Sequence, residues 1–175
     1  MAVNTSNSGF LLIAPTDDPA GTTLQCDTYT RATKFTSPAG ATGITEIGWY
    51  CDNATEEADF EVGIYSHDAD NNLPLDLLAS VTIAKGTGAG WIKGTLSFPI
   101  SENTIYWLAV QLDNTATTTN TNYTTTTGSL TKRHSPATFL QNPWVTTTAS
   151  AAVLYAIYAI YTTKSSILTT MKGVW

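Results

Sequence analysis

Alternation of apolar and polar residues with a period of two recurs along the chain and is the feature that most constrains its fold. In ADFEVGIYS, the apolar residues Phe60, Val62 and Ile64 alternate with other residues, and TIYWLAVQLD repeats the pattern over residues 104–113. A period of two places successive side chains on opposite faces of a strand. No segment shows the repeat of about 3.6 residues that marks an amphipathic helix. The sequence therefore predicts an all-β protein.

About eight short strands are expected, because such segments recur between clusters of Gly, Pro, Asn and Asp. Threonine supports this interpretation: 33 of the 175 residues are Thr, and a β-branched side chain suits the exposed face of a strand. Residues 151–163 are apolar on both faces, which is typical of a central strand. We predict an antiparallel β-sandwich of the jelly-roll type over residues 15–163.

Two apolar terminal segments, residues 1–14 and 164–175, lie outside this alternating body. Either they pack back on their own domain, or they are extended arms that dock on neighbouring subunits, since apolar tails left in water favour association. The sequence leaves both interpretations open. The candidate assembly residues of the two arms are Phe10, Leu12, Ile167, Leu168 and Trp175.

The charge of the chain argues against nucleic acid as a partner. The net charge is −6, and only 13% of the residues are charged. Phosphate binding needs clustered Lys and Arg, whereas the one local basic run, Lys132 to His134, is interpreted as a solvated turn. The sequence contains no run of 18 or more apolar residues, so no membrane span is predicted. The first residues lack the basic region of a signal peptide, so we expect a protein made in a cytoplasm.

The residues that could support catalysis are few. His67 and His134 are the only histidines, both are placed in polar loops, and no GxSxG motif accompanies them. Cys26 and Cys51 are too few for a structural zinc site. A disulfide between them could form, but the sequence favours two buried thiols. We expect no enzyme activity.

The segment HDADNNLPLDLLAS, residues 67–80, begins with the alternate spacing of oxygen ligands that opens a calcium loop. An EF-hand is excluded, because Leu73 and Ala79 occupy the positions where that motif requires Gly and Glu. In the alternative, Asp and Asn cap their own backbone in a turn. A looser calcium site would use Asp68, Asp70, Asn72 and Asp76. Apart from this calcium ion, no cofactor is expected.

Two tryptophans are candidates for contact with a sugar ring. Trp91 and Trp107 lie opposite the main apolar faces of their predicted strands, so we expect them at the surface. An exposed indole can stack on a pyranose ring while nearby polar groups bind its hydroxyls. Trp91 and Trp107 are the candidate glycan-binding residues, and the alternative is that the tryptophans fill the core of the sandwich.

The middle of the chain, with EIGWYCDNATEEADFEVGIYSHD followed by GWIKGTLSFPISENTIYWLAVQLDNT, resembles a jelly-roll module of bacteriophage virion proteins and carbohydrate-binding-like domains. The likeness covers roughly residues 30–161. It implies a non-catalytic structural protein of the virion, such as a capsid decoration, fibre or tail accessory protein, that contacts capsid or tail subunits and forms a homotrimer. The alternative is a lectin-like module that binds host-cell glycans.

Overall fold

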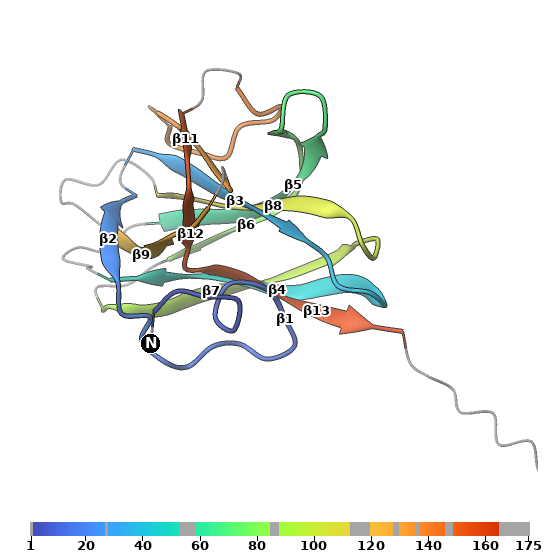
Figure 1. The fold of residues 1–175 in the computed structure, drawn as a ribbon, viewed down its shortest axis with the longest axis horizontal. Helices are drawn as coiled ribbons and strands as arrows, with labels where there is room; N and C mark the ends of the chain where they lie inside the picture. Colours follow the sequence, from blue (N-terminus) through green and yellow to red (C-terminus); the bar gives the residue numbers. More distant parts are fainter. Residues whose placement is uncertain are drawn as a thin grey trace, which may run out of the picture.

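The computed structural model describes residues 2–26, 28–52, 59–84, 88–112, 120–127, 130–135, 137–145 and 149–164. These residues form 13 β-strands in three sheets and no helix, which confirms the all-β prediction (Figure 1). Accordingly, no helix of the described residues could span a membrane.

The four-stranded sheet has the order β1-β13-β4-β7. Its strands are, in that order, Gly9–Leu11, Ile157–Thr163, Ala41–Cys51 and Gly90–Pro99. The six-stranded sheet has the order β11-β10-β3-β8-β5-β6. Its strands are Ala149–Ala151, Thr131–His134, Thr30–Thr36, Ile105–Leu112, Asp59–Asp68 and Leu73–Ala84.

The third sheet is small and has the order β12-β9-β2, with bounds Val153–Tyr155, Asn120–Thr125 and Thr22–Gln25. It lies at one end of the sandwich, where β12 continues into β13 of the four-stranded sheet (Figure 1). All strand pairs are antiparallel except β1 with β13, which is parallel.

Eight principal strands make the two-layer sandwich: β1, β3, β4, β5, β6, β7, β8 and β13. When these strands are numbered one to eight along the chain, β1-β13-β4-β7 has the order 1-8-3-6. The strands β3-β8-β5-β6 of the other sheet have the order 2-7-4-5. This is the jelly-roll arrangement that the sequence predicts. The five further strands, β2, β9, β10, β11 and β12, are only three to six residues long.

The main core lies between the two large sheets and confirms the alternation seen in the sequence. One face of each long strand supplies it, because β-strand side chains alternate between the two faces. The core residues of β4, β5, β8 and β13 include Ile44, Ile47, Trp49, Phe60, Val62, Ile64, Leu108, Val110, Leu112 and Ile157.

A second core covers the outer face of the six-stranded sheet. We call residues 137–145 the covering segment, because they lie on this face and pack against it. The hydroxyl of Tyr65 donates a hydrogen bond to the carbonyl of Gln141 at 2.8 Å, and the Gln111 amide donates to the Ala137 carbonyl at 2.9 Å. The members of the second core are Ala32, Tyr65, Trp107, Ala109, Leu140 and Trp144.

The N-terminal segment belongs to the sandwich. Strand β1 pairs with β13, and the Phe10 ring lies edge-on to Tyr106 at a centroid distance of 6.2 Å. Residues 9–11 of this segment therefore pack on their own domain. Leu12 and Ile13 differ, because they are 62% and 81% exposed. The predicted arm residues Ile167, Leu168 and Trp175 lie outside the described residues.

Candidate ligand-binding site

A cavity of about 290 Å³ lies between the three-stranded sheet and the β3–β10–β11 end of the six-stranded sheet. This volume is near the lower end of the range for small-molecule sites. Six strands contribute to its wall, so the cavity exists only because the third sheet closes against the sandwich. The lining includes Leu24, Arg31, Tyr123, Arg133, Val153 and Tyr155.

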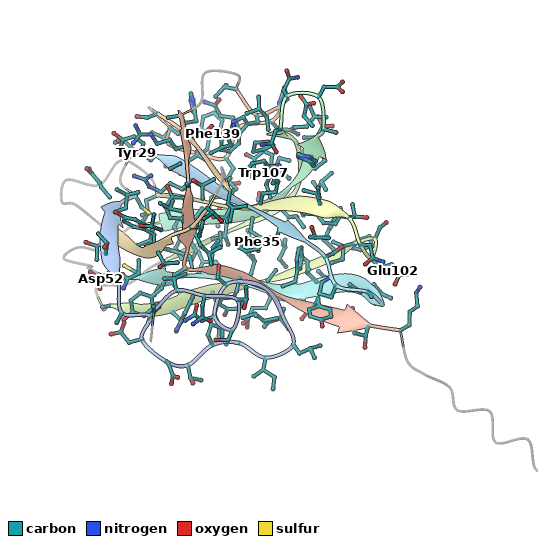
Figure 2. All side chains as sticks on the ribbon, in the orientation of Figure 1. Tyr29, Phe35, Asp52, Glu102, Trp107 and Phe139 are labelled. Carbon is teal, nitrogen blue, oxygen red and sulfur yellow. The ribbon has the colours of Figure 1, made fainter. Side chains whose placement is uncertain are left out.

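Two arginines face each other across neighbouring strands at this cavity. Arg31 of β3 lies directly opposite Arg133 of β10 in the antiparallel register, so their side chains share one face of the sheet. Both guanidinium groups lie over the ring of Tyr29, at 4.8 Å and 5.5 Å from its centroid. Tyr29 directly precedes β3 (Figure 2). The cation–π contacts offset part of the repulsion between two like charges held directly opposite each other.

The side chain of Arg31 is fixed in place. It is 2% exposed, its Nε and Nη2 donate to the carbonyl of Gln25, and its Nη1 donates to the hydroxyl of Tyr155 at 3.1 Å. Within the described part of the chain, no carboxylate forms an ion pair with it. A buried charge is ordinarily paired, so Arg31 is an unusual group for a cavity wall.

The Arg133 side chain is exposed and its donors are available. Among the described residues, its guanidinium contacts the Tyr29 ring and donates no hydrogen bond. The planar guanidinium carries a fork of donors that matches a carboxylate or a sulfur or phosphorus oxyanion.

Positive charge is concentrated here although the chain as a whole is acidic. Four of its eight Lys and Arg residues, namely Arg31, Lys34, Lys132 and Arg133, lie on the adjacent strands β3 and β10. The six strands that line the cavity contain no Asp or Glu. Three of these cations, Arg31, Lys132 and Arg133, belong to the cavity lining, which includes no carboxylate among the described residues.

Lys132 points away from the two arginines, because it lies between Thr131 and Arg133 on β10 and side chains alternate. Its ammonium donates to the Ser150 hydroxyl at 2.6 Å. Burial, and secondarily the positive charge of Lys34, lowers the pKa of Lys132. Lys132 and Ser150 both belong to the lining of the cavity, so Lys132 adds a third positive charge to its wall.

The structure corrects the prediction for Trp107. As predicted, this residue lies opposite the main apolar face of β8, but the covering segment buries that side of the sheet and leaves Trp107 0% exposed. Its indole N–H donates to Nδ1 of His67 at 3.1 Å, and its side chain packs with Leu140 and Trp144 of the covering segment, beside the six-stranded sheet (Figure 2). Trp107 is a core residue and offers no free face to a sugar.

Trp91 is partly buried on β7 of the four-stranded sheet. Its indole N–H donates to the carbonyl of Asp17 at 2.9 Å, and its ring meets Tyr50 and Tyr158 edge-on at 5.3 Å and 5.4 Å. Trp91 and Trp107 lie on different sheets, so the structure does not bring the two predicted sugar contacts together.

The predicted calcium ligands do not converge. Asp68, Asp70 and Asp76 form no cluster placed to hold a metal within the described residues. The carboxylate of Asp68 instead accepts hydrogen bonds from the backbone N–H groups of Asp70 and Asn71, and from the Asn71 amide. The capped turn that the sequence offered as the alternative is what the structure contains.

The fourth predicted calcium ligand, Asn72, also has another role. Its side-chain oxygen accepts a hydrogen bond from the ammonium of Lys34 at 2.6 Å. Asn72 has a φ of +53°, a conformation that Asn tolerates better than most residues. This residue therefore closes the turn after β5.

The histidines and cysteines are not among the residues that line the cavity. Both histidines are on strands, His67 within β5 and His134 at the end of β10, rather than in the predicted loops. Cys26 and Cys51 are buried thiols, as the sequence favours. Burial raises the pKa of Cys26 to about 11, even though the positive charge of Arg31 opposes this shift.

Sequence reasoning missed the two arginines of the cavity. The run Lys132 to His134 is strand β10 rather than a solvated turn. The basic run was the one sequence signal for this site, because the chain has only eight Lys and Arg residues. Its partner, Arg31, lies far earlier in the chain, and no local pattern links the two segments.

Comparisons with known proteins give a likeness of fold. No family model and no curated protein matches the chain. The structure is similar to that of the cysteine protease and lectin-like domains of Cwp84, a surface layer associated protein of Clostridium difficile, with a TM-score of 0.50 and 12% identity. The similarity covers 78% of this chain and 32% of that chain, so the matched region spans about a third of the chain of that structure. What the two share is the fold.

Proposed function

We propose that this protein is a non-catalytic carbohydrate-binding module whose ligand occupies the cavity between the small sheet and β3–β10–β11. The observation that carries the proposal is the pairing of aromatic and polar groups in one enclosed space. The partly buried ring of Tyr123 lies in the same lining as the Tyr155 ring and the Arg31 guanidinium. An aromatic face with a few fixed polar groups is the arrangement that binds small polar ligands.

The fold is compatible with this role. A jelly roll presents its loops and its sheet ends without needing any catalytic group, and lectin domains are among its common uses. The likeness to a chain with a lectin-like domain supports the proposal at the level of the fold.

The test is a glycan array probed with the full chain, followed by calorimetry on the saccharides that bind. Tyr123→Ala should weaken binding severalfold, because the ring face is lost. Tyr161→Ala is the matched control, since Tyr161 is also partly buried but lies on β13, away from the cavity lining. The proposal is wrong if no saccharide on the array binds. It is also wrong if Tyr123→Ala and Tyr161→Ala reduce the saccharide affinity equally.

A second candidate function is assembly, which the resemblance to virion proteins implies. The specific observation is the exposed pair Leu12 and Ile13, which directly follows the edge strand β1. Exposed apolar side chains beside an unpaired strand edge favour association. Under this hypothesis the full chain forms a homotrimer in analytical ultracentrifugation, and changing both residues to Ser yields monomers. A monomeric wild-type chain would contradict it.

A further inference from the structure

We infer that the cavity is selective for acidic saccharides, that is, for sugars that carry a carboxylate or a sulfate, and that Arg133 supplies the contact to the acidic group. This inference rests on the proposed function and names the ligand class of the same site. Its basis is the opposed pair Arg31 and Arg133, which no carboxylate on the surrounding strands neutralises.

Among the described residues of the cavity lining, the positive charge has no acidic counterpart. Like charges directly opposite each other on neighbouring strands destabilise a sheet, and here Arg31 is nearly completely buried. The described residues provide no ion pair for either guanidinium. An anion bound beside both groups would offset the repulsion, so the site gains more from an acidic ligand than from a neutral one.

The free hydrogen-bond donors belong mainly to Arg133. A guanidinium has five N–H donors, and those of Arg31 are partly used by Gln25 and Tyr155. These bonds hold Arg31 in position as a fixed positive charge. Arg133 is exposed, and its fork of donors faces no acceptor among the described residues. The bidentate contact to an oxyanion therefore falls to Arg133.

Tyr29 orients both guanidinium groups. Its ring supports them through cation–π contacts at 4.8 Å and 5.5 Å, which limits their movement before a ligand arrives. The Tyr123 and Val153 side chains on the facing small sheet leave an apolar wall for the sugar ring. The acidic group thus points toward β10, and the ring lies against the small sheet.

The net charge of −6 does not oppose this selectivity at close range. Exposed charges are screened beyond a Debye length of about 8 Å at physiological ionic strength. The charged residues of the lining are Arg31, Lys132 and Arg133, so the ligand contacts cations and no carboxylate of the described lining.

The experiment compares matched saccharides on one array, each neutral sugar displayed beside its uronate or its sulfate ester, with calorimetry on the best pair. The acidic member should bind roughly tenfold more tightly, the usual gain from charge-assisted hydrogen bonds. Arg133→Gln should reduce the two affinities to similar values. This variant keeps the fold intact because Arg133 is exposed, and an unchanged melting temperature verifies this.

The matched control is Lys93→Gln, which removes the same charge from an exposed position on β7. Its preference for the acidic sugar should equal that of the wild type. If neutral sugars bind as tightly as acidic ones, the inference is wrong while the carbohydrate-binding function stands. If no saccharide binds, the proposed function itself fails. Equal losses in Arg133→Gln and Lys93→Gln would show general electrostatic attraction and overturn the inference, as would inorganic sulfate binding as tightly as the acidic sugar.

Discussion

The carboxylate of Glu61 accepts a hydrogen bond from the backbone N–H of Leu140 at 2.6 Å. This bond joins the outer face of β5 to the covering segment, which is distant in sequence. The other carboxylate oxygen of Glu61 accepts a hydrogen bond from the Ser80 hydroxyl at 2.7 Å, so the carboxylate is held between β6 and the covering segment. The covering segment thereby turns the outer face of the six-stranded sheet into a second core.

Replacing Glu61 with Ala should loosen the covering segment. The Leu140 N–H would lose its acceptor, and an unsatisfied, partly buried donor costs about 1–3 kcal/mol in the free energy of unfolding. Urea denaturation measures this loss. Tryptophan fluorescence should shift to the red, because Trp107 packs beneath this segment and Trp144 belongs to it. Ser80→Ala keeps the bond to Leu140 and should cost much less; equal losses in both variants would contradict the assigned role of Glu61.

Trp107→Ala should make the protein unfold more easily, because Trp107 belongs to the core rather than to the ligand site. Removing a fully buried Trp costs about 3–5 kcal/mol in the free energy of unfolding, because a cavity remains. Trp107→Phe keeps most of the packing, and its affinity for any bound saccharide should equal that of the wild type. Chemical denaturation and calorimetry measure the two quantities. Weaker saccharide binding by a stably folded Trp107→Phe variant would restore this residue as a contact.

Alkaline pH should destabilise the protein through Cys26. Burial raises the pKa of its thiol from 9.0 to about 11 in the folded state, so the unfolded chain loses this proton first as the pH rises. The contribution of Cys26 to stability is therefore complete below pH 9.0 and is lost as the pH rises toward 11. Urea denaturation at a series of pH values measures the loss. Cys26→Ala should show a shallower decline over this interval, and an identical decline in both proteins would refute the assignment.

The turn after β5 should depend on Asp68 rather than on calcium. Hydrogen bonds from Asn71 and Asp70 lower the pKa of the Asp68 carboxyl, so its contribution to stability is present above the ordinary value of 3.8 and is lost as the pH falls. Asp68→Ala should lower the melting temperature, whereas Asp70→Ala, which removes an exposed carboxylate, should change it little. Neither calcium nor a chelator should shift the wild-type value. A clear rise with calcium that Asp70→Ala abolishes would revive the metal site.

The strands of the sandwich could be predicted because their signal is local. In β5 and β8 the period of two assigns each side chain to a face, and the structure places Val62, Ile64, Leu108 and Val110 in the main core as expected. The short strands β2, β9 and β10 carry weaker alternation. Their pairing comes from partners far along the chain, so the basic run that begins at Lys132 has the local pattern of a turn although it forms a strand.

By itself, the sequence determined the all-β class and the two faces of each long strand, because alternation is a property of neighbouring residues. The tertiary structure alone decided which faces meet water. Trp107 lies on the face that the sequence assigned to it, yet the covering segment buries it. Arg31 and Arg133 meet only through the register of β3 and β10. Long-range pairing sets that register, and no local pattern contains it.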